Sequence, residues 1–214
     1  DQYGLVYNQG NEGSCTANSE AVGFDFTRVK EGLKPLLPSR QFIYYNERKM
    51  EGTVNEDSGA QIRDGIKSLN QLGVCTEQSW PYDISKMAVK PPQHCYTEAL
   101  NNKIKEYLRL DNSNLFTLKE CLSDGYGFVF GFTVFEAFES EEVAKTGIVE
   151  MPKAGEDSLG GHAVFCVGYD DSTNMFKVRN SWGEEWGDKG HFYIPYDYLT
   201  NVKLADDFWT IRLI

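Results

Sequence analysis

One stretch near the start of the sequence, residues 7–18, combines a glycine-rich loop with a cysteine that opens a helical pattern. Ala17, Ala21 and Phe24 recur at the spacing of one helix face, which puts Cys15 in the first turn of the predicted helix. Unpaired backbone N–H groups and the positive end of the helix dipole favour the thiolate form there. The thiolate is the nucleophilic form, so Cys15 is a candidate nucleophile. The alternative is a buried structural cysteine.

A cysteine nucleophile needs a base to hold its proton, and that base needs an orienting partner. His162 follows two glycines and opens a predicted strand, which indicates a ring at a rim and not in a core. A hairpin of residues 162–169 and 175–180 brings Asn180 close to His162. The amide oxygen of Asn180 can then accept the imidazole N–H, and Trp182 can cover that hydrogen bond.

The remaining polar candidates have more limited roles. Gln9 precedes Cys15 by six residues, and its side-chain amide can form an oxyanion site together with the backbone N–H of Cys15. His94 lies in a proline-rich stretch and is expected on the surface, whereas His191 begins a strand and is expected to be packed or at an edge. A zinc site around His94 and its neighbouring cysteines lacks paired CxxC spacing, so no metal or other cofactor is expected.

The elements that position these residues change in character along the chain. Three helices are predicted: one from Cys15 to about residue 32, one capped by Ser39, and one that begins at residues 57–59 and stops at Gly73. An irregular crossover is expected over residues 80–93. In the second half, the residue pattern predicts a short helix at 117–122 and a hairpin with a five-residue loop at 170–174. It also predicts strands at 103–110, 128–135, 162–169, 175–180 and 191–194. This order predicts an α+β fold with a cleft between a helical and a β-rich lobe.

Composition is that of a globular protein that can bury a large core. The chain has 214 residues, of which 41% are hydrophobic and 25% charged, and its net charge is −11. This charge argues against nucleic acid and anionic membrane as partners, and no apolar run is long enough to span a membrane. An acidic surface is also compatible with secretion or with a lysosome-like or vacuole-like acidic compartment.

Three segments carry a resemblance to a known family. They are Gln9-Gly10-x-x-Gly13-Ser14-Cys15, then Gly161-His162-Ala163-Val164 with Val167-Gly168-Tyr169, and finally Asn180-Ser181-Trp182-Gly183-x-x-Trp186-Gly187-x-x-Gly190. Their order and content resemble the papain-like cysteine proteases, peptidase family C1. The 147 residues from Cys15 to His162 fall within the roughly 130–150 typical of such enzymes. Trp80-Pro81-Tyr82 occupies the place of the family's Tyr-Pro-Tyr, so the similarity spans nearly the whole chain.

The resemblance implies a single papain-like peptidase domain over residues 1–214. Its helical lobe would cover about residues 10–100, and its β-rich, barrel-like lobe about residues 101–214 plus the N-terminal segment. The implied activity is hydrolysis of peptide bonds through a thioester, with an endopeptidase favoured over an exopeptidase. Cys15 would be the nucleophile and His162 the general acid/base, Asn180 would orient the imidazole, and Gln9 would complete the oxyanion hole.

The resemblance also implies how a substrate is held. Gly59 and Ala60 correspond loosely to a glycine pair that binds the substrate backbone as an extra strand, and Gly161 and Trp182 would also line the substrate site. The implied partners are a peptide or protein substrate and an inhibitory propeptide outside these residues, and the enzyme is expected to be a monomer.

The chain departs from the family next to the nucleophile. The family usually has Cys where Glu12 stands and Trp where Thr16 stands, and the cysteine that would pair with the first of these is missing from residues 55–60. That disulfide therefore cannot form, and we expect Glu12 to be solvated on the loop. Cys95 matches a family cysteine whose partner is absent. Cys75 is a candidate substitute that would close a loop of about 20 residues, worth roughly 3 kcal/mol on the chain-entropy model.

Two other functions remain open at this point. One is a Cys/His acyltransferase that uses an amine in place of water as acceptor. The other is a catalytically inactive homologue that acts as a binding or structural protein. The substitutions at Glu12 and Thr16, next to the candidate nucleophile, are the reason to consider it.

Overall fold

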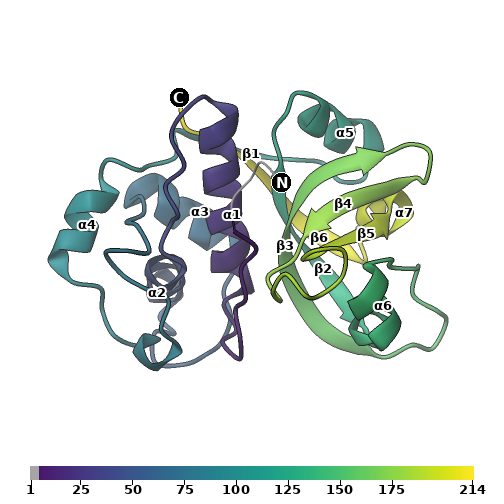
Figure 1. Ribbon diagram of the computed structural model, residues 1–214, viewed down its shortest axis with the longest axis horizontal. Helices are drawn as coiled ribbons and strands as arrows, with labels where there is room; N and C mark the ends of the chain where they lie inside the picture. The colour runs from purple at the N-terminus through teal and green to yellow at the C-terminus, as the bar shows by residue number, and fades with distance from the viewer. Residues whose placement is uncertain (1–4) are drawn as a thin grey trace. The chain divides into compact units, whose positions relative to one another are not determined.

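The structure is a computed structural model that describes residues 5–214 (Figure 1). These residues form two compact units. Unit 1 consists of Leu5, Gln9–Leu108 and Ile211–Ile214, and unit 2 consists of Val6–Asn8 and Arg109–Thr210. Among the described residues, every helix is too short or too polar to cross a membrane.

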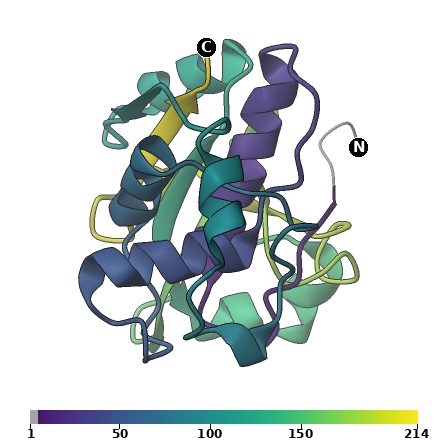
Figure 2. The same cartoon turned by 90° about the vertical axis from the view of Figure 1, so that its left-hand side faces the viewer.

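Unit 1 is helical. Its helices are α1 (Cys15–Lys30), α2 (Arg40–Glu51), α3 (Ile62–Gln71), the 3₁₀ helix η1 (Ile84–Lys86) and α4 (Gln93–Ala99). Helices α1, α2 and α3 all contact one another, and α1 and α2 run in clearly different directions (Figure 2). The buried residues of these helices include Phe24 of α1, Phe42 and Ile43 of α2 and Ile66 of α3, which are at most 1% exposed.

Local sequence accounts for the ends of α1 and α2. Helix α1 covers the range expected from its periodicity. Ser39 caps α2 as predicted, because its hydroxyl accepts the backbone N–H of Phe42 at 3.1 Å. Gly52 ends α2 in the left-handed conformation, with φ of +78°, which glycine adopts without steric cost.

One helix prediction in unit 1 is wrong, and one stretch predicted to be irregular contains a short helix. Helix α3 begins at Ile62 and not at residues 57–59, because the carboxylate of Asp57 accepts hydrogen bonds from Gly13 and Tyr44 and is not a helix cap. Residues 80–92 are irregular as predicted apart from η1, and the stretch ends at Gln93, the first residue of α4. Burial of Cys95 and Ala99 stabilises this short helix, which carries no strong start signal.

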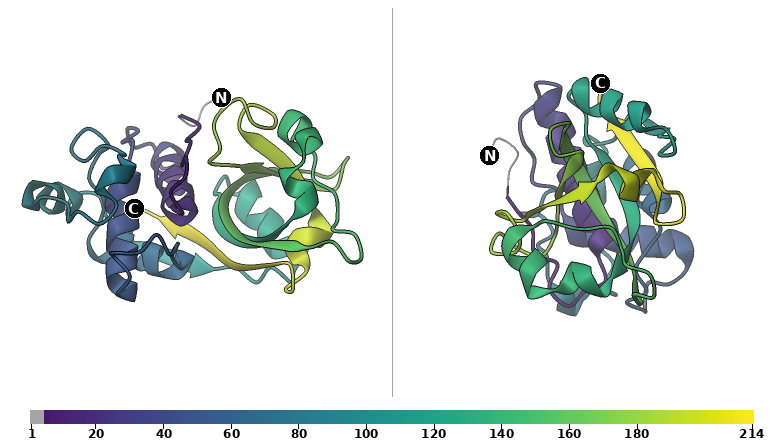
Figure 3. Two further views of the ribbon diagram at one scale, coloured as in Figure 1. Left: turned by 90° about the horizontal axis from the view of Figure 1, so that it is seen from below. Right: turned by 90° about the vertical axis from the view of Figure 1, so that its right-hand side faces the viewer.

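Unit 2 is rich in β-structure. The strands of the sheet are β1 (Glu106–Arg109), β2 (Phe128–Phe135), β3 (Ser158–Asp170), β4 (Met175–Arg179), β5 (His191–Pro195) and β6 (Ala205–Arg212). Most of β1 and the last two residues of β6 belong to unit 1, and the other strands belong to unit 2. The short helices are α5 (Leu115–Ser123), η2 (Glu136–Glu139), α6 (Glu141–Thr146) and α7 (Tyr196–Thr200). The strand order is β1-β6-β2-β3-β4-β5, and the sheet curls strongly (Figure 3). Within the described residues its two end strands do not pair, so the sheet is open and the expected barrel-like closure is absent.

Strands β2 and β3 form the centre of the sheet. They pair antiparallel, with Phe132 opposite His162. Strand β2 has the predicted bounds, whereas β3 begins at Ser158, so His162 is its fifth residue and does not open it. The β3–β4 loop has four residues and not five, because Asp170 pairs with Met175. An aromatic core covers this region, with the Phe130 and Phe208 rings stacked at 5.0 Å.

Candidate active site

Cys15 is the first residue of α1 and is half-buried. The N-cap residue Ser14 makes no capping hydrogen bond, and the first turn contains no acidic side chain. The Ser14 hydroxyl instead pairs with the hydroxyl of Tyr82 at 2.5 Å. The positive end of α1 is therefore not neutralised by its own sequence, and this environment favours a thiolate.

Gln9 is held in place beside this helix end. Its side-chain Nε2 donates to the backbone oxygen of Glu12 at 3.0 Å, and its backbone oxygen accepts the hydroxyl of Tyr82 at 2.9 Å. Only 9% of Gln9 is exposed. The loop thus fixes the amide that the sequence assigned to an oxyanion site, and Tyr82 holds both ends of that loop.

The expectation that Glu12 is solvated is wrong. Glu12 is 1% exposed, and its carboxylate accepts a hydrogen bond from Nε2 of Gln41 on α2 at 2.9 Å. This hydrogen bond offsets part of the cost of removing the carboxylate from water. Local sequence does not indicate this contact, because Gln41 lies 29 residues away in the chain.

A second carboxylate connects the loop before Cys15 to the Gly59-Ala60 segment. The Asp57 carboxylate accepts the backbone N–H of Gly13 at 3.0 Å and also the hydroxyl of Tyr44. Tyr44 in turn accepts the backbone N–H of Gly59 at 3.2 Å. Gly59 has a φ of +69°, and residues 58–61 belong to no helix or strand. Unit 1 therefore brings the Gly59-Ala60 segment next to the loop that precedes Cys15.

Glu47 of α2 is a functional candidate that the sequence did not indicate. It is completely buried, and its Oε1 accepts the hydroxyl of Thr16, the residue after Cys15, at 2.6 Å. Burial raises the pKa of Glu47 well above its ordinary value, and the nearby charges of Cys15 and Glu51 raise it further. The hydrogen bond from Thr16 and the charge of Arg48 oppose this rise in pKa.

His162 makes the hydrogen bond expected from the hairpin. Its Nε2 lies 2.8 Å from Oδ1 of Asn180, which also accepts the backbone N–H of Ser181. With Nε2 engaged as donor, the ring presents Nδ1 for proton exchange. Trp182 stacks over the imidazole at 5.1 Å between centroids. His162 is 7% exposed, so it is more enclosed than the rim position that we expected.

The surroundings of His162 explain its electrostatics. Burial lowers the pKa of His162 to about 4, while the hydrogen bond to Asn180 and the charge of Glu139 act in the opposite direction. Phe138 lies in η2 beside both His162 and Trp182, with its ring centroid 5.4 Å from that of Trp182. No motif in the sequence indicates this position of Phe138, although the residue follows the buried strand β2 by three residues. Gly161 is exposed and has open space where a Cβ would lie.

The five cysteines are all free, so the suggested Cys75–Cys95 disulfide is absent. The two thiols are nevertheless neighbours. Burial is the main cause that raises the pKa of Cys75, and the charge and hydrogen bonding of the nearby Cys95 raise it further. Burial likewise keeps the pKa of Cys95 raised. Both are therefore expected to be protonated thiols at neutral pH. Residues 5–214 contain no group of three or more His, Cys, Asp and Glu side chains arranged to hold a metal ion.

Residues 3–210 match the profile of the papain family cysteine proteases. The chain belongs to the papain family of cysteine proteases. It is therefore a cysteine peptidase by family, with the α+β fold that the sequence predicted.

Individual relatives agree with this family membership. The chain is 48% identical over 212 residues to "Uncharacterized peptidase C1-like protein L477" of Acanthamoeba polyphaga mimivirus, which covers 95% of this chain and 68% of that protein. It is 29% identical to "Cysteine proteinase 2" of Zea mays, covering 87% of this chain and 51% of the maize protein. Among solved structures, xylellain, a cysteine protease from Xylella fastidiosa, is 46% identical with a TM-score of 0.92, covering 99% of this chain and 83% of that chain.

Proposed function

We propose that this papain-family chain is an endopeptidase in which Cys15 is the nucleophile and His162 is the general acid/base. The observation that carries the proposal is the hydrogen bond of 2.8 Å between His162 Nε2 and Asn180 Oδ1 under the Trp182 ring. It fixes the imidazole tautomer and leaves Nδ1 for the proton that the thiol gives up. Cys15, at an uncapped helix N-terminus, supplies the matching acid.

The chemistry has two stages. The Cys15 thiolate attacks the scissile carbonyl carbon, a C–S bond forms, and the oxyanion is held by the Gln9 amide and the Cys15 backbone N–H. The His162 imidazolium gives its proton to the leaving amine as the C–N bond breaks, which leaves a thioester. His162 then takes a proton from water, the resulting hydroxide attacks the thioester, and the C–S bond breaks to release the acid.

Substrate binding rests on backbone groups in this proposal. Residues 58–61 lie outside regular secondary structure and include Gly59, which supports pairing of Gly59 and Ala60 with a peptide backbone. Exposed Gly161, with no atom near its missing Cβ, and the half-buried Trp182 would line the same substrate. We further propose that the enzyme acts as a monomer and that an inhibitory propeptide outside these residues is its regulator.

Labelling and product analysis together test the proposal. An epoxysuccinyl peptide should modify Cys15 with one equivalent at mildly acidic pH, while the four buried cysteines stay unmodified and serve as internal controls. Cys15→Ala should abolish turnover without unfolding the protein, and Asn180→Ala should keep partial activity. Cleavage of peptides blocked at both ends distinguishes an endopeptidase from an exopeptidase. Turnover by Cys15→Ala would overturn the assignment, and amide transfer to an added amine in preference to water would indicate an acyltransferase.

A further inference from the structure

Arg48 of α2 is a charged side chain that unit 1 encloses completely. It is 0% exposed, and no ion pair among residues 5–214 includes it. Removing a charge from water costs free energy unless other groups replace the lost hydrogen bonds. The groups that bind this guanidinium therefore show which parts of the fold depend on it.

Four backbone oxygens bind the guanidinium. Its Nε donates to the oxygen of Tyr44, one turn earlier in α2, at 3.1 Å. Nη1 donates to the oxygens of Val54 at 2.7 Å and Glu56 at 3.0 Å, and Nη2 donates to the oxygen of Met87 at 2.6 Å. The N–H groups of arginine form a rigid planar fork. One side chain thus fixes α2, the loop that follows it and the residue after η1 relative to one another.

The loop after α2 leads to the segment that is proposed to bind substrate. Residues 52–61 belong to no helix or strand, and Arg48 binds two of their backbone oxygens. The guanidinium carbon also lies 3.9 Å from the centroid of the Tyr44 ring. The Tyr44 hydroxyl in turn donates to Asp57 and accepts the backbone N–H of Gly59. Arg48 therefore supports this segment both directly and through Tyr44.

The 3₁₀ helix η1 connects the same guanidinium to the loop before Cys15. Met87, whose backbone oxygen accepts from Arg48, directly follows η1. Ile84, the first residue of η1, lies against Gly10, because its Cδ1 is 3.3 Å from the position that a Cβ of Gly10 would occupy. The guanidinium thus supports both this loop and the segment proposed to bind substrate from one point inside unit 1.

We propose that Arg48 is a positioning residue for the substrate, because its guanidinium holds Gly59 and Ala60 where a peptide backbone binds. The proposal rests on the proposed function, which assigns substrate binding to this segment. Arginine is specific for the role. Methionine is of similar length but donates no hydrogen bond, and the three donors on the single nitrogen of lysine cannot bind four oxygens.

Kinetics of the full chain with a peptide blocked at both ends test the proposal. In Arg48→Met and Arg48→Lys, KM should rise about tenfold while kcat changes less, because the loss falls on binding of the peptide backbone. Iodoacetamide is too small to need the Gly59-Ala60 segment, so its rate of reaction with Cys15 should stay close to that of wild type. Hydrogen exchange of the Gly59 amide, followed by NMR, should become faster in both variants.

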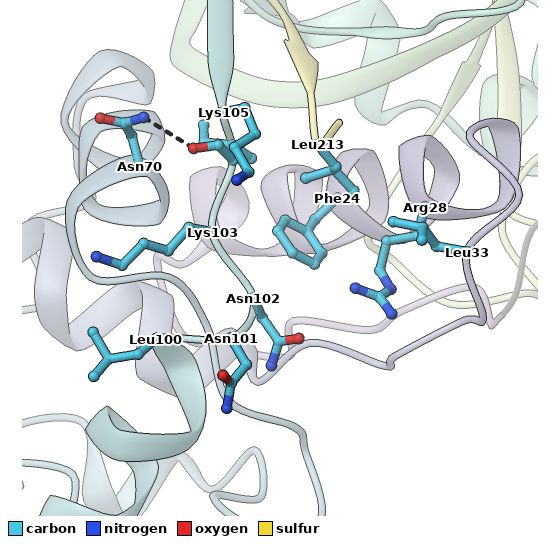
Figure 4. A pocket seen from close by; sticks show the side chains of 11 residues that line it. Phe24, Arg28, Leu33, Asn70, Leu100, Asn101, Asn102, Lys103, Lys105 and Leu213 are labelled. Atoms are coloured by element: carbon cyan, nitrogen blue, oxygen red, sulfur yellow. Dashed lines mark hydrogen bonds between the residues drawn. The ribbon is translucent and has the colours of Figure 1, made fainter.

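Arg28→Met is the matched control. The Arg28 side chain also donates to a backbone oxygen, that of Lys34 at 2.7 Å, and its guanidinium carbon lies 6.0 Å from the centroid of the Phe24 ring. Arg28 lines a pocket of about 380 Å³ in unit 1, whose lining contains none of the hydrogen-bond partners of Arg48 (Figure 4). Thirteen residues of α1 separate Arg28 from Cys15, about 20 Å along the helix axis. This variant should keep the wild-type KM and the wild-type exchange of Gly59.

Tyr44→Phe keeps the role testable if Arg48→Met does not fold. It leaves the ring beside the guanidinium and removes only the hydroxyl that binds Gly59. It should therefore raise KM and speed the exchange of Gly59, as the arginine variants do. Thermal unfolding of each variant reports whether it folds.

The outcomes separate this role from the proposed function. Wild-type protein that does not cleave peptides through Cys15 would contradict the proposed function, and the exchange of Gly59 would still test what Arg48 holds in place. The role of Arg48 is overturned if its folded variants keep the wild-type KM and exchange rate. It is also overturned if iodoacetamide labelling slows as much as peptide cleavage does, or if Arg28→Met has the same effects.

Discussion

Both carboxylate oxygens of Asp57 lie 3.0 Å from the backbone nitrogen of Gly13. The contact joins the loop before Cys15 to the segment that carries Gly59. Papain-like proteases usually have a disulfide between these two regions. This chain cannot form it, because Glu12 stands at one of the two cysteine positions and residues 55–60 contain no cysteine. A charge-assisted hydrogen bond stands in place of that cross-link, and bonds of this type are about twice as strong as neutral ones.

Removing this carboxylate should loosen the active-site loop. Asp57→Ala leaves the Gly13 N–H and the Tyr44 hydroxyl without their acceptor, so we expect unfolding free energy to fall by about 1–3 kcal/mol. We also expect KM for peptides to rise, because Gly59 loses its link to the loop. Urea unfolding and steady-state kinetics measure the two effects. Glu56→Gln, at the exposed neighbouring position, is the control, and an Asp57→Ala enzyme with unchanged stability and KM would contradict this role.

The charge on His162 should depend on the thiolate. In Cys15→Ala no sulfur anion is present, and burial should hold the pKa of His162 at about 4, so the ring is neutral at mildly acidic pH. In the wild type, a thiolate partner should keep the imidazolium to higher pH. NMR titration of the histidine ring protons measures both values. Equal pKa values in the two proteins would contradict pairing between Cys15 and His162.

The same depressed pKa makes a prediction about stability. Between the ordinary value of 6.5 and about 4, the unfolded chain binds a proton that the folded Cys15→Ala protein does not. Its unfolding free energy should therefore decrease as pH falls through this window, by up to about 3 kcal/mol. Cys15→Ala/His162→Gln should lack this part of the pH dependence. The comparison also removes the contribution of His191, whose pKa burial lowers as well.

Glu47 should destabilise the protein when it ionises. Because burial raises its pKa, the folded state holds a proton that the unfolded state releases as pH rises above 4.5. Glu47→Gln keeps an acceptor for Thr16 and has no proton to lose, so it should be more stable than wild type at neutral pH. This advantage should shrink as pH approaches 4.5. Urea unfolding at both pH values measures it, with Lys49→Gln, at an exposed position of the same helix, as the control. A less stable Glu47→Gln at neutral pH would show that the carboxylate is ionised and stabilising.

Gly65 of α3 makes room for the buried Glu20 carboxylate. A Cβ at position 65 would lie 2.2 Å from both Glu20 oxygens, closer than any real contact. Alanine usually stabilises a helix interior by about 1 kcal/mol relative to glycine. Here the overlap should outweigh this gain, so Gly65→Ala should lower unfolding free energy by about 1–3 kcal/mol. Gly168→Ala has no atom within 4 Å of its new Cβ and serves as the control.

Features specified by neighbouring residues could be predicted from the sequence. The bounds of β2 follow from an uninterrupted apolar run, and the cap of α2 follows from Ser39. The contact between His162 and Asn180 could also be predicted, because a short hairpin links the two strands that carry them.

Features that depend on distant partners could not be predicted. The sequence pattern predicts Glu12 as a solvated loop residue, but in the fold its carboxylate accepts a hydrogen bond from Gln41. It predicts Asp57 at a helix start, but the carboxylate of Asp57 accepts hydrogen bonds from Gly13 and Tyr44. Strand β6 also depends on distant partners, because it pairs with β1 and β2 and its own residues show no strict alternation of buried and exposed positions.

The absence of cross-links among the five cysteines has a practical consequence. Thiol enzymes are kept active with reductants, but in many secreted proteins those reagents also reduce the disulfides that stabilise the fold. Here dithiothreitol should keep the sulfur of Cys15 reduced without changing the melting temperature. A reducing expression host likewise removes no bond that these residues use to hold their fold.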